Sequence, residues 1–389
     1  MKLEIFSTPK EFTKLFFILI AIPLFFKASY GILNSHVNQQ TQRPNVGIDF
    51  VAYMTGSLVL KTQPQDLYNI NVQTEVQKNY LKEDIAGLLS YRNTPFVAFL
   101  NLPYTLINPN QSYFINYIVQ TILLLIYAWL LLKVIILKEN KPNIKHFIVL
   151  TFMYYPMWYV ATFGQISPLI AIILVCIYGL LKNNKPFWVG ILSVLLILKL
   201  QYIILIPFLF LIVKDKKSFL KGLSISFIGM LMLDSLLYRG FYLVEYLKFL
   251  ALSEKDVLGT NLEKLVSISV IFNIFKASST VIVTTLALLY GSFLIFIEKS
   301  KQKISLEIIY SLMILFIVFI NYHTAMVDLI FLLIPIILLY MTSIKENNTK
   351  AKITAISLFL IPWLTAIELH ALIPVIGILA SIYLIKPTR

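Results

Sequence analysis

The chain has 389 residues, of which 58% are hydrophobic and 13% charged, and its formal net charge is +14. Soluble domains carry about a quarter charged residues, so this composition excludes a water-soluble globular protein. Nucleic-acid binders gather Lys and Arg on one soluble face with stacking aromatics. Here the basic residues lie between apolar runs, which indicates a membrane protein with no nucleic-acid partner.

Apolar runs of about 17–25 residues, the length that crosses ~30 Å of hydrocarbon, recur along the chain. The first, at about 12–33, lacks a small-residue cleavage site after it, so we expect a retained span rather than a signal peptide. The predicted fold is an all-α polytopic bundle of about 12 spans in a single domain, 1–389. The later spans are expected near 112–137, 146–162, 165–181, 186–199, 201–213, 219–237, 278–297, 304–321, 325–343, 352–368 and 371–385.

The segment 186–213 has two interpretations, one long helix or a hairpin. One long helix would put Lys185 and Lys214 on opposite sides of the membrane, so the positive-inside rule favours a hairpin that turns near Lys199-Leu200-Gln201. With this topology the whole excess of +14 is cytoplasmic. We therefore expect an integral cell membrane protein, inner or plasma, with both termini in the cytoplasm.

Two predicted extracytoplasmic loops are long, at 34–111 and 238–277, whereas the inner loops have only a few residues. The first holds an apolar segment at 94–107, too short to span comfortably, which we interpret as an interfacial or re-entrant element. The second mixes aromatic and charged residues, as suits the headgroup zone. Function is therefore expected on the outer side.

Asp49 and Gln165 are the first two candidate site residues. Asp49 lies among apolar and aromatic neighbours in the first outer loop, where a carboxylate can act as a general base, although a solvated loop aspartate is the alternative. Gln165 follows Gly164 in a short outer turn and offers an amide donor and acceptor to an outer cavity. An ordinary glycine turn remains the other interpretation.

Basic residues on the same side are candidates for phosphate binding. Lys199 stands at the outer boundary of its span, next but one to Gln201, where an ammonium must pair, bind an anion or snorkel to water. Arg92 offers an outward guanidinium that can clamp a phosphate, or is a simple rim charge.

His323 and Asp328 lie around another outer turn. His323 opens the turn and Asp328 is about one turn inside the next helix, where an ionised carboxylate needs a partner or a water-filled cavity. An interfacial histidine is the alternative for His323. Glu368 and His370 form a further outer turn, for which we favour no special role.

These residues resemble the integral membrane glycosyltransferases of the GT-C class, specifically glycosyltransferase family 87, which includes polyprenyl-phosphate-mannose-dependent alpha-(1→2)-mannosyltransferases. The resemblance runs in order from about residue 12 to 343. Its matching pieces are Asp49-Phe50-x-x-Tyr53, Asp66-Leu67-Tyr68, Tyr91 to Pro95, Gly164-Gln165, Lys199, and His323 with Asp328.

The resemblance implies an inverting transfer of a sugar, a hexose such as mannose, from a polyprenyl-phosphate donor to a glycolipid or glycan acceptor. It makes Asp49 the base that deprotonates the acceptor hydroxyl. Lys199, Arg92 and His323 are then expected at the donor phosphate. Gln165, Gln201, Asp328 and Tyr53 are expected to bind substrate.

The chain departs from the family pattern at two places. The chain has Gly164-Gln165-Ile166-Ser167 where the family often has Gly-Gln-x-Asn. It also has Lys199-Leu200 where the family often has Lys-Pro. The sugar and acceptor specificity can therefore differ from that of the mannosyltransferases.

No cofactor is expected. No metal-ligand pair with zinc-like spacing is present, and a divalent ion at Asp49 would need a second carboxylate from the fold, so dependence on such an ion stays open. The one cysteine, Cys176, cannot form an intramolecular disulfide.

Two other function classes remain. A transporter or flippase of a polar lipid-linked substrate also has many spans, but such proteins place their sites near the membrane midplane and often show internal repeats. A non-catalytic scaffold has no positive sign in the sequence.

Overall fold

The computed structural model describes residues 37–38, 43–44, 48–81, 88–136, 147, 151–238, 242–253 and 265–385. Almost all of this described chain is helical, and a two-stranded antiparallel ribbon, β1 with β2, precedes the helices. The elements are β1 (Val37–Asn38), β2 (Arg43–Pro44), α3 (Ile48–Thr62), η2 (Pro64–Asp66), α4 (Ile70–Leu81), α5 (Pro95–Asn101), η3 (Leu102–Leu106), α6 (Pro109–Leu131), η4 (Leu132–Ile136), α8 (Tyr155–Phe163), α9 (Ser167–Lys182), α10 (Pro186–Val194), η5 (Leu195–Ile204), α11 (Leu205–Ile212), α12 (Lys216–Tyr238), α13 (Tyr242–Ser253), α14 (Ser269–Ile274), α15 (Ser279–Ser300), α16 (Leu306–Phe319), η7 (Met326–Leu332), α17 (Leu333–Lys345), α18 (Thr349–Leu360), η8 (Ile361–Ile367) and α19 (Leu372–Ile385).

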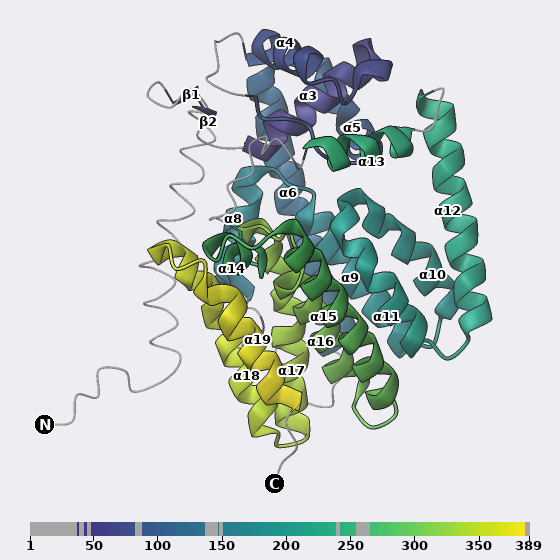
Figure 1. The fold of residues 1–389 in the computed structure, drawn as a ribbon, viewed down its shortest axis with the longest axis vertical. Helices are drawn as coiled ribbons and strands as arrows, with labels where there is room; N and C mark the ends of the chain where they lie inside the picture. The colour runs from purple at the N-terminus through teal and green to yellow at the C-terminus, as the bar shows by residue number, and fades with distance from the viewer. Residues whose placement is uncertain are drawn as a thin grey trace, which may run out of the picture.

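Short helices cover one end of the longer ones, which we call the α3 end (Figure 1). There α3 packs against α4 and α5, and α13 contacts α5. The segment 94–107 forms two short helical pieces, α5 and η3, because Pro95 and Pro103 each stand in a first helical turn, where a missing N–H costs nothing. The segment is therefore helical, and its expected place as an interfacial or re-entrant element of an outer loop stays a prediction.

The chain reverses direction at Lys199, as the hairpin interpretation predicts. Lys199 has non-helical backbone angles, φ −132° and ψ 84°, inside the otherwise helical stretch 186–212. A continuous helix of that length would hold its two ends ~40 Å apart at 1.5 Å per residue. Instead, Pro186 and Ile212 line the same cavity. Lys199 thus marks the turn between two helical arms.

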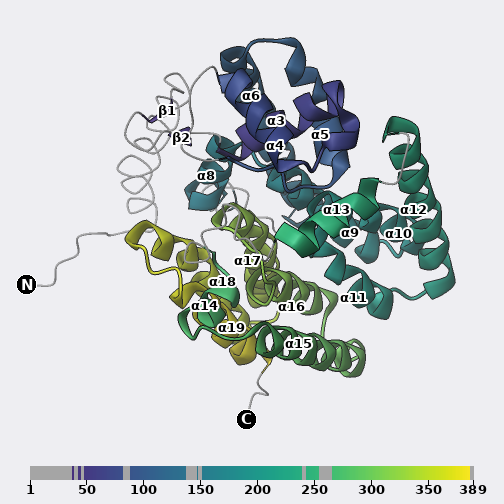
Figure 2. The ribbon, with the colours of Figure 1, turned by 45° about the horizontal axis from the view of Figure 1, so that its top comes forward.

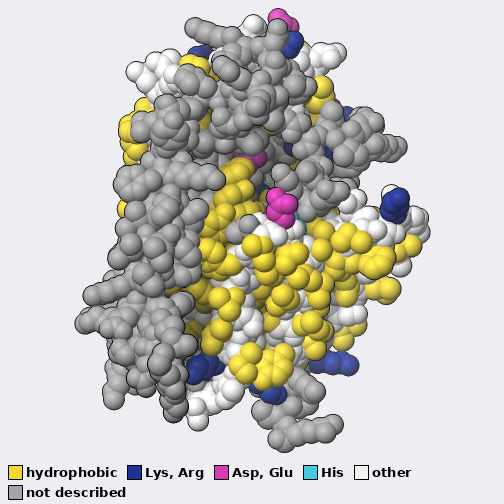
Figure 3. Space-filling model, turned by 90° about the vertical axis from the view of Figure 1, so that its left-hand side faces the viewer, with side chains coloured by type: hydrophobic (Ala, Val, Ile, Leu, Met, Phe, Trp, Pro, Cys, Tyr) yellow, Lys and Arg dark blue, Asp and Glu magenta, His cyan; other side chains and the backbone are white. Residues whose placement is uncertain are grey.

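The core of the bundle is formed by α16, η7 and α17, which lie centrally between α9, α15 and α19 in Figure 2. Of the most apolar stretch in Met326–Lys345, 83% is buried, whereas the corresponding share in α15 is only 6%. Large apolar side chains of the outer helices are exposed, with Leu236 at 78% and Leu288 at 66%. Figure 3 shows a broad hydrophobic area on one side of the molecule, with basic side chains at its lower edge. Water would not solvate such a surface, but lipid does.

The apolar helices identify a membrane protein. Within the described residues, five helical segments are long and apolar enough to cross a membrane, and three more are apolar but shorter. One of the five, Pro186–Ile212, is the stretch that folds back at Lys199. The expected first span, 12–33, lies outside the described residues, so the predicted total of about 12 crossings stays a prediction.

Candidate active site

Asp49 lies in the first turn of α3 at the α3 end of the bundle. The next residue, Phe50, is fully buried and packs edge-on against Tyr104 and Tyr113, with ring centroids 5.4 Å apart in both pairs. This aromatic contact ties the start of α3 to η3 and α6. It fixes the helix end from which the part-buried Asp49 side chain extends.

Gln165 joins Asp49 to the interior. Its Nε2 donates a hydrogen bond to Asp49 Oδ2 at 2.8 Å, and its Oε1 accepts one from Lys199 Nζ, also at 2.8 Å. The preceding Gly164 ends α8 with φ at 69°, a left-handed conformation that glycine adopts without strain. A β-carbon at Gly164 would lie 2.6 Å from Asn116 Nδ2 and 2.8 Å from Phe50 Cβ. The tight glycine turn therefore sets the position of Gln165 against α3.

Lys199 and Asp328 form a buried ion pair behind Gln165. Their exposed fractions are 8% and 0%. Ser167 Oγ lies between them, 2.7 Å from Asp328 Oδ1 and 3.0 Å from Lys199 Nζ. The other carboxylate oxygen of Asp328 accepts the backbone N–H of Ala325 at 3.3 Å and so caps η7. The kink at Lys199 and the start of η7 are thus held together by opposite charges.

The Lys199 ammonium has three acceptors, namely Gln165 Oε1, Ser167 Oγ and Asp328 Oδ1. An ammonium has three N–H donors, so all of them are used inside the protein. Lys199 therefore orients the Gln165 amide, with its oxygen towards Lys199 and its nitrogen towards Asp49. In this arrangement any action of Lys199 on a phosphate is electrostatic rather than by a direct hydrogen bond.

Gln201 and His323 meet next to this network. Gln201 Nε2 donates to the His323 carbonyl oxygen at 2.8 Å, and Asn321 Nδ2 donates to the Gln201 carbonyl oxygen at 3.0 Å. Asn321 Oδ1 also accepts the His323 backbone N–H at 3.2 Å. The hairpin turn after Lys199 thereby holds the loop between α16 and η7. His323 is brought to the same end of the bundle as the ion pair.

Arg92 is held by a separate set of contacts. Tyr246 of α13 donates its hydroxyl to the Arg92 carbonyl oxygen at 3.2 Å. The segment before Arg92 is clamped by two buried glutamines one turn apart on α4. Gln73 Oε1 accepts Tyr91 N–H at 2.8 Å, and Gln77 Oε1 accepts Leu89 N–H at 3.0 Å. This clamp was not predicted from the sequence, although two glutamines at i and i+4 on a helix share one face.

Tyr53 lies one turn beyond Asp49 on the same face of α3 and is 3% exposed. Its side chain reaches the backbone of Ile166, beside Gln165, and burial raises its pKa, an effect to which the Asp49 charge adds. Tyr53 therefore packs α3 onto the glycine turn with its phenol neutral.

The Asp49 carboxyl has an altered acidity. Burial raises its pKa to about 6, and the nearby Asp328 charge adds to the shift, whereas the Gln165 hydrogen bond and the Lys199 charge act in the opposite direction. At neutral pH the carboxylate is therefore ionised but more basic than an ordinary aspartate. Among the described residues, Gln165 is its hydrogen-bond donor, through Oδ2. Asp49 Oδ1 can thus accept a proton from an incoming hydroxyl.

The structure brings together four of the predicted residues, Asp49, Gln165, Lys199 and Asp328, in one hydrogen-bonded chain. Sequence reasoning gave no role to Ser167, which bridges the ion pair. The sequence feature that could have pointed to Ser167 is its place in Gly164-Gln165-Ile166-Ser167, where the family often has Asn. No group of three or more His, Cys, Asp or Glu that could hold a metal occurs among the described residues.

The model of glycosyltransferase family 87 matches residues 91–318, more than half of the chain. No curated protein and no solved structure matches. The matched region contains Arg92, Gln165 and Lys199. It begins after Asp49 and ends before Asp328, so both acidic residues of the hydrogen-bonded chain are contributed by segments outside it.

Proposed function

The chain belongs to glycosyltransferase family 87, and from this premise we propose that it is an inverting glycosyltransferase that acts at the extracytoplasmic membrane face. The proposed donor is a polyprenyl-phosphate sugar, a hexose such as mannose, and the proposed acceptor is a glycolipid or glycan. The observation that carries the proposal is the Asp49 carboxylate, bound by Gln165 at the α3 end, with a pKa of about 6.

The chemistry needs one base on the acceptor side. Asp49 takes the proton of the acceptor hydroxyl. At the same time the acceptor oxygen forms a bond to the anomeric carbon of the sugar. The bond from that carbon to the phosphate oxygen breaks, and the polyprenyl phosphate leaves with the electron pair. A phosphate is a good leaving group, so no strong acid is required opposite the base. A single displacement inverts the anomeric centre.

The remaining residues divide into binding and positioning roles. Arg92 and His323, both part-buried at the α3 end, are proposed to bind the donor phosphate, and Lys199 adds positive potential there. Gln201 and Tyr53 hold the loops that form the substrate site. Gln165 and Asp328 are positioning residues, because each acts on the site through the hydrogen-bonded chain to Asp49.

The test is transfer by the purified protein from a polyprenyl-phosphate hexose to envelope glycolipid, with the product followed by mass spectrometry. General bases contribute about 10²–10⁴ to rate, so Asp49→Asn is expected to lower transfer by about a thousandfold. The variant should remain as stable as the wild type, because removing a charge that burial disfavours does not weaken the fold.

Glu75→Gln is the matched control, since Glu75 is an exposed carboxylate on the neighbouring helix α4. It should transfer at the wild-type rate. Full transfer by Asp49→Asn would show that Asp49 is not the base. Uptake of a lipid-linked sugar into proteoliposomes without any glycosylated product would instead support a transporter.

A further inference from the structure

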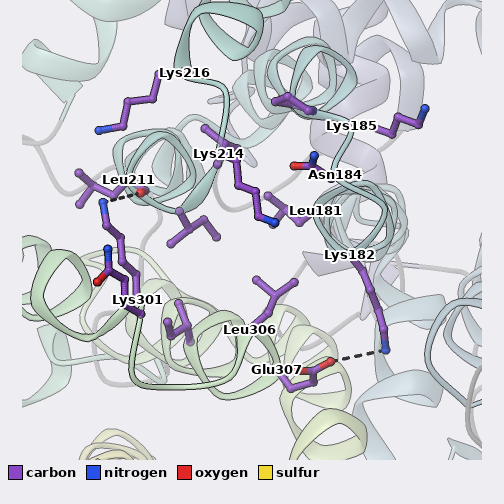
Figure 4. Close-up of a pocket in the computed structure, with 15 residues that line it drawn as sticks. Leu181, Lys182, Asn184, Lys185, Leu211, Lys214, Lys216, Lys301, Leu306 and Glu307 are labelled. Atoms are coloured by element: carbon purple, nitrogen blue, oxygen red, sulfur yellow. Dashed lines mark hydrogen bonds and ion pairs between the residues drawn. The ribbon is translucent and has the colours of Figure 1, made fainter.

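A large cavity lies at the opposite end of the bundle from Asp49. Its volume is about 710 Å³, and it is lined by the end of α9, the start of α10, the end of α11 and the connection from α15 to α16 (Figure 4). Helix α9 runs from Ser167 at the ion pair to Lys182 at this cavity. At 1.5 Å per residue the two ends are ~24 Å apart, so the cavity is a separate site.

The charge lining this cavity is mainly positive. Five lysines and one glutamate line it, Lys182, Lys185, Lys214, Lys216, Lys301 and Glu307. Lys182 Nζ lies 3.5 Å from Glu307 Oε1, and Lys301 pairs with Glu298 at 2.6 Å. The nearby Asp215 is used to cap α12, where it accepts the Ser218 N–H at 3.0 Å. The local carboxylates therefore leave an excess of positive charge at the cavity.

The other three lysines of the cavity are exposed, namely Lys185, Lys214 and Lys216. Figure 4 shows the Lys214 side chain extending into the cavity, and the ammonium of Lys216 lies 5.1 Å from the centre of the Phe210 ring. Lysines at helix ends often only snorkel to water. Snorkelling does not require a cavity, whereas this one has the size of a small-ligand pocket, for which about 300–1,000 Å³ is usual.

The walls of the cavity combine charge with apolar surface. Leu181, Ile212 and Leu306 stand beside the lysines, and Asn184 and Gln302 add neutral amides. Basic pockets between the ends of membrane helices bind phosphate headgroups by charge, while apolar walls accept the first carbons of the acyl chains. A compact dianion or a phosphodiester suits such a lining better than a carboxylate does, because several ammonium groups can share its oxygens.

We propose that this cavity binds a phosphate group, carried by an anionic lipid headgroup or free in solution. The apolar walls and the exposed apolar faces of the surrounding α12 and α15 favour the lipid as its source. The site is independent of the transfer reaction, because its residues lie at the other end of α9 and α16.

The test measures ligand affinity with full-length protein in detergent, by thermal stabilisation during titration with dioleoyl-phosphatidylglycerol, dioleoyl-phosphatidylcholine or inorganic phosphate. The cavity variant is Lys185→Gln with Lys214→Gln. Its matched control is Lys299→Gln with Lys352→Gln, two exposed lysines at the same end that do not line the cavity. Each lysine near an anionic lipid headgroup accounts for about fivefold in affinity.

We expect phosphatidylglycerol to bind the cavity variant at least about tenfold more weakly than the wild type. The control should stay within about twofold, and Lys214→Arg should retain binding because it keeps the charge. The same lysine dependence with inorganic phosphate alone would support the phosphate site and assign its ligand to solution. Equal weakening in the cavity variant and the control, or no preference over phosphatidylcholine and no phosphate binding, would overturn the proposal.

Discussion

The two ends of helix α9 carry charge in different ways. At Ser167 the charges of Lys199 and Asp328 are buried, matched one to one and linked by hydrogen bonds. At Lys182 five lysines line an open cavity, and a single carboxylate, Glu307, lines it with them. The Lys182–Glu307 pair joins α9 to α16, whereas the Lys199–Asp328 pair joins η5 to η7 and contacts α9 through Ser167, and the two pairs differ in access to water.

This difference separates structural from ligand-binding charge. The attraction within a buried ion pair offsets the cost of desolvation only when the remaining donors and acceptors are also hydrogen-bonded. The Lys199 ammonium meets this condition, because each of its three N–H groups has an acceptor. Exposed lysines lose little by standing without a carboxylate and are available to an external anion. The end at Ser167 is suited to positioning a base, and the end at Lys182, with its excess of lysines over carboxylates, to binding a charged ligand.

The largest predicted effect is a loss of stability when one partner of the buried pair is removed. Lys199→Met leaves the Asp328 carboxylate buried without its counter-charge, which should cost about 3–5 kcal/mol of unfolding free energy. Lys182→Met, at the other end of the same helix, breaks a pair whose side chains are 27% and 29% exposed. That change should cost less than about 1 kcal/mol.

Denaturant titration in detergent micelles measures both variants. The double variant Lys199→Met with Asp328→Leu should recover most of the loss, because no uncompensated charge remains. Transfer activity should stay low in the double variant, since Gln165 has lost the donor that orients it. Equal losses at the two ends of α9 would remove the distinction between them.

A smaller loss is expected from Gly164→Ala. The left-handed backbone and the short distances from a new β-carbon to Asn116 and Phe50 should together cost about 1–3 kcal/mol. Transfer should fall further than stability, because the adjacent Gln165 moves away from Asp49. Product formation and unfolding are measured on the same preparation.

Gly229→Ala and Gly291→Ala are the controls for this change. Both glycines are inside the peripheral helices α12 and α15, where a β-carbon meets nothing within 4 Å. Each should be neutral or slightly stabilising, because alanine favours a helix over glycine. A loss at these positions as large as that at Gly164 would argue against a special role for the turn.

Much of the bundle follows from apolar length and the positions of the lysines. The turn at Lys199 was predicted because the lysines at 182–185 and 214–221 had to lie on one side, and the cavity that Pro186 and Ile212 share agrees. Gly164 and Gln165 were placed correctly in a turn between helices. These features depend on the local pattern of apolar residues and on the positive-inside rule, so sequence alone could predict them.

The partners of the charged residues could not be predicted in this way. Lys199 and Asp328 are 129 positions apart, and neither hydropathy nor spacing indicates that one neutralises the other. The position of Lys199 in the sequence therefore predicts only a donor-phosphate ligand; that role stays a prediction, and the structure adds the contacts of Lys199 with Gln165, Ser167 and Asp328. Ser167 was seen only as a departure from a family pattern, because its bridging position requires three helices to converge.

The smallest predicted effect concerns the pH dependence of transfer. Asp49 acts as a base only when ionised, so activity should fall about tenfold for each pH unit below its pKa of about 6.

The Gln165 hydrogen bond stabilises the ionised form of Asp49, so Gln165→Leu should move this acid limb of the pH–rate profile to higher pH. Lys182 lies at the other end of α9, ~24 Å from Ser167, so Lys182→Met should leave the limb in place because screening removes the influence of a charge at such a distance. Rate against pH, measured from pH 5 to 8 for the three proteins, tests both statements. A limb that stays unchanged in Gln165→Leu would mean that the residue titrating in the rate is not Asp49.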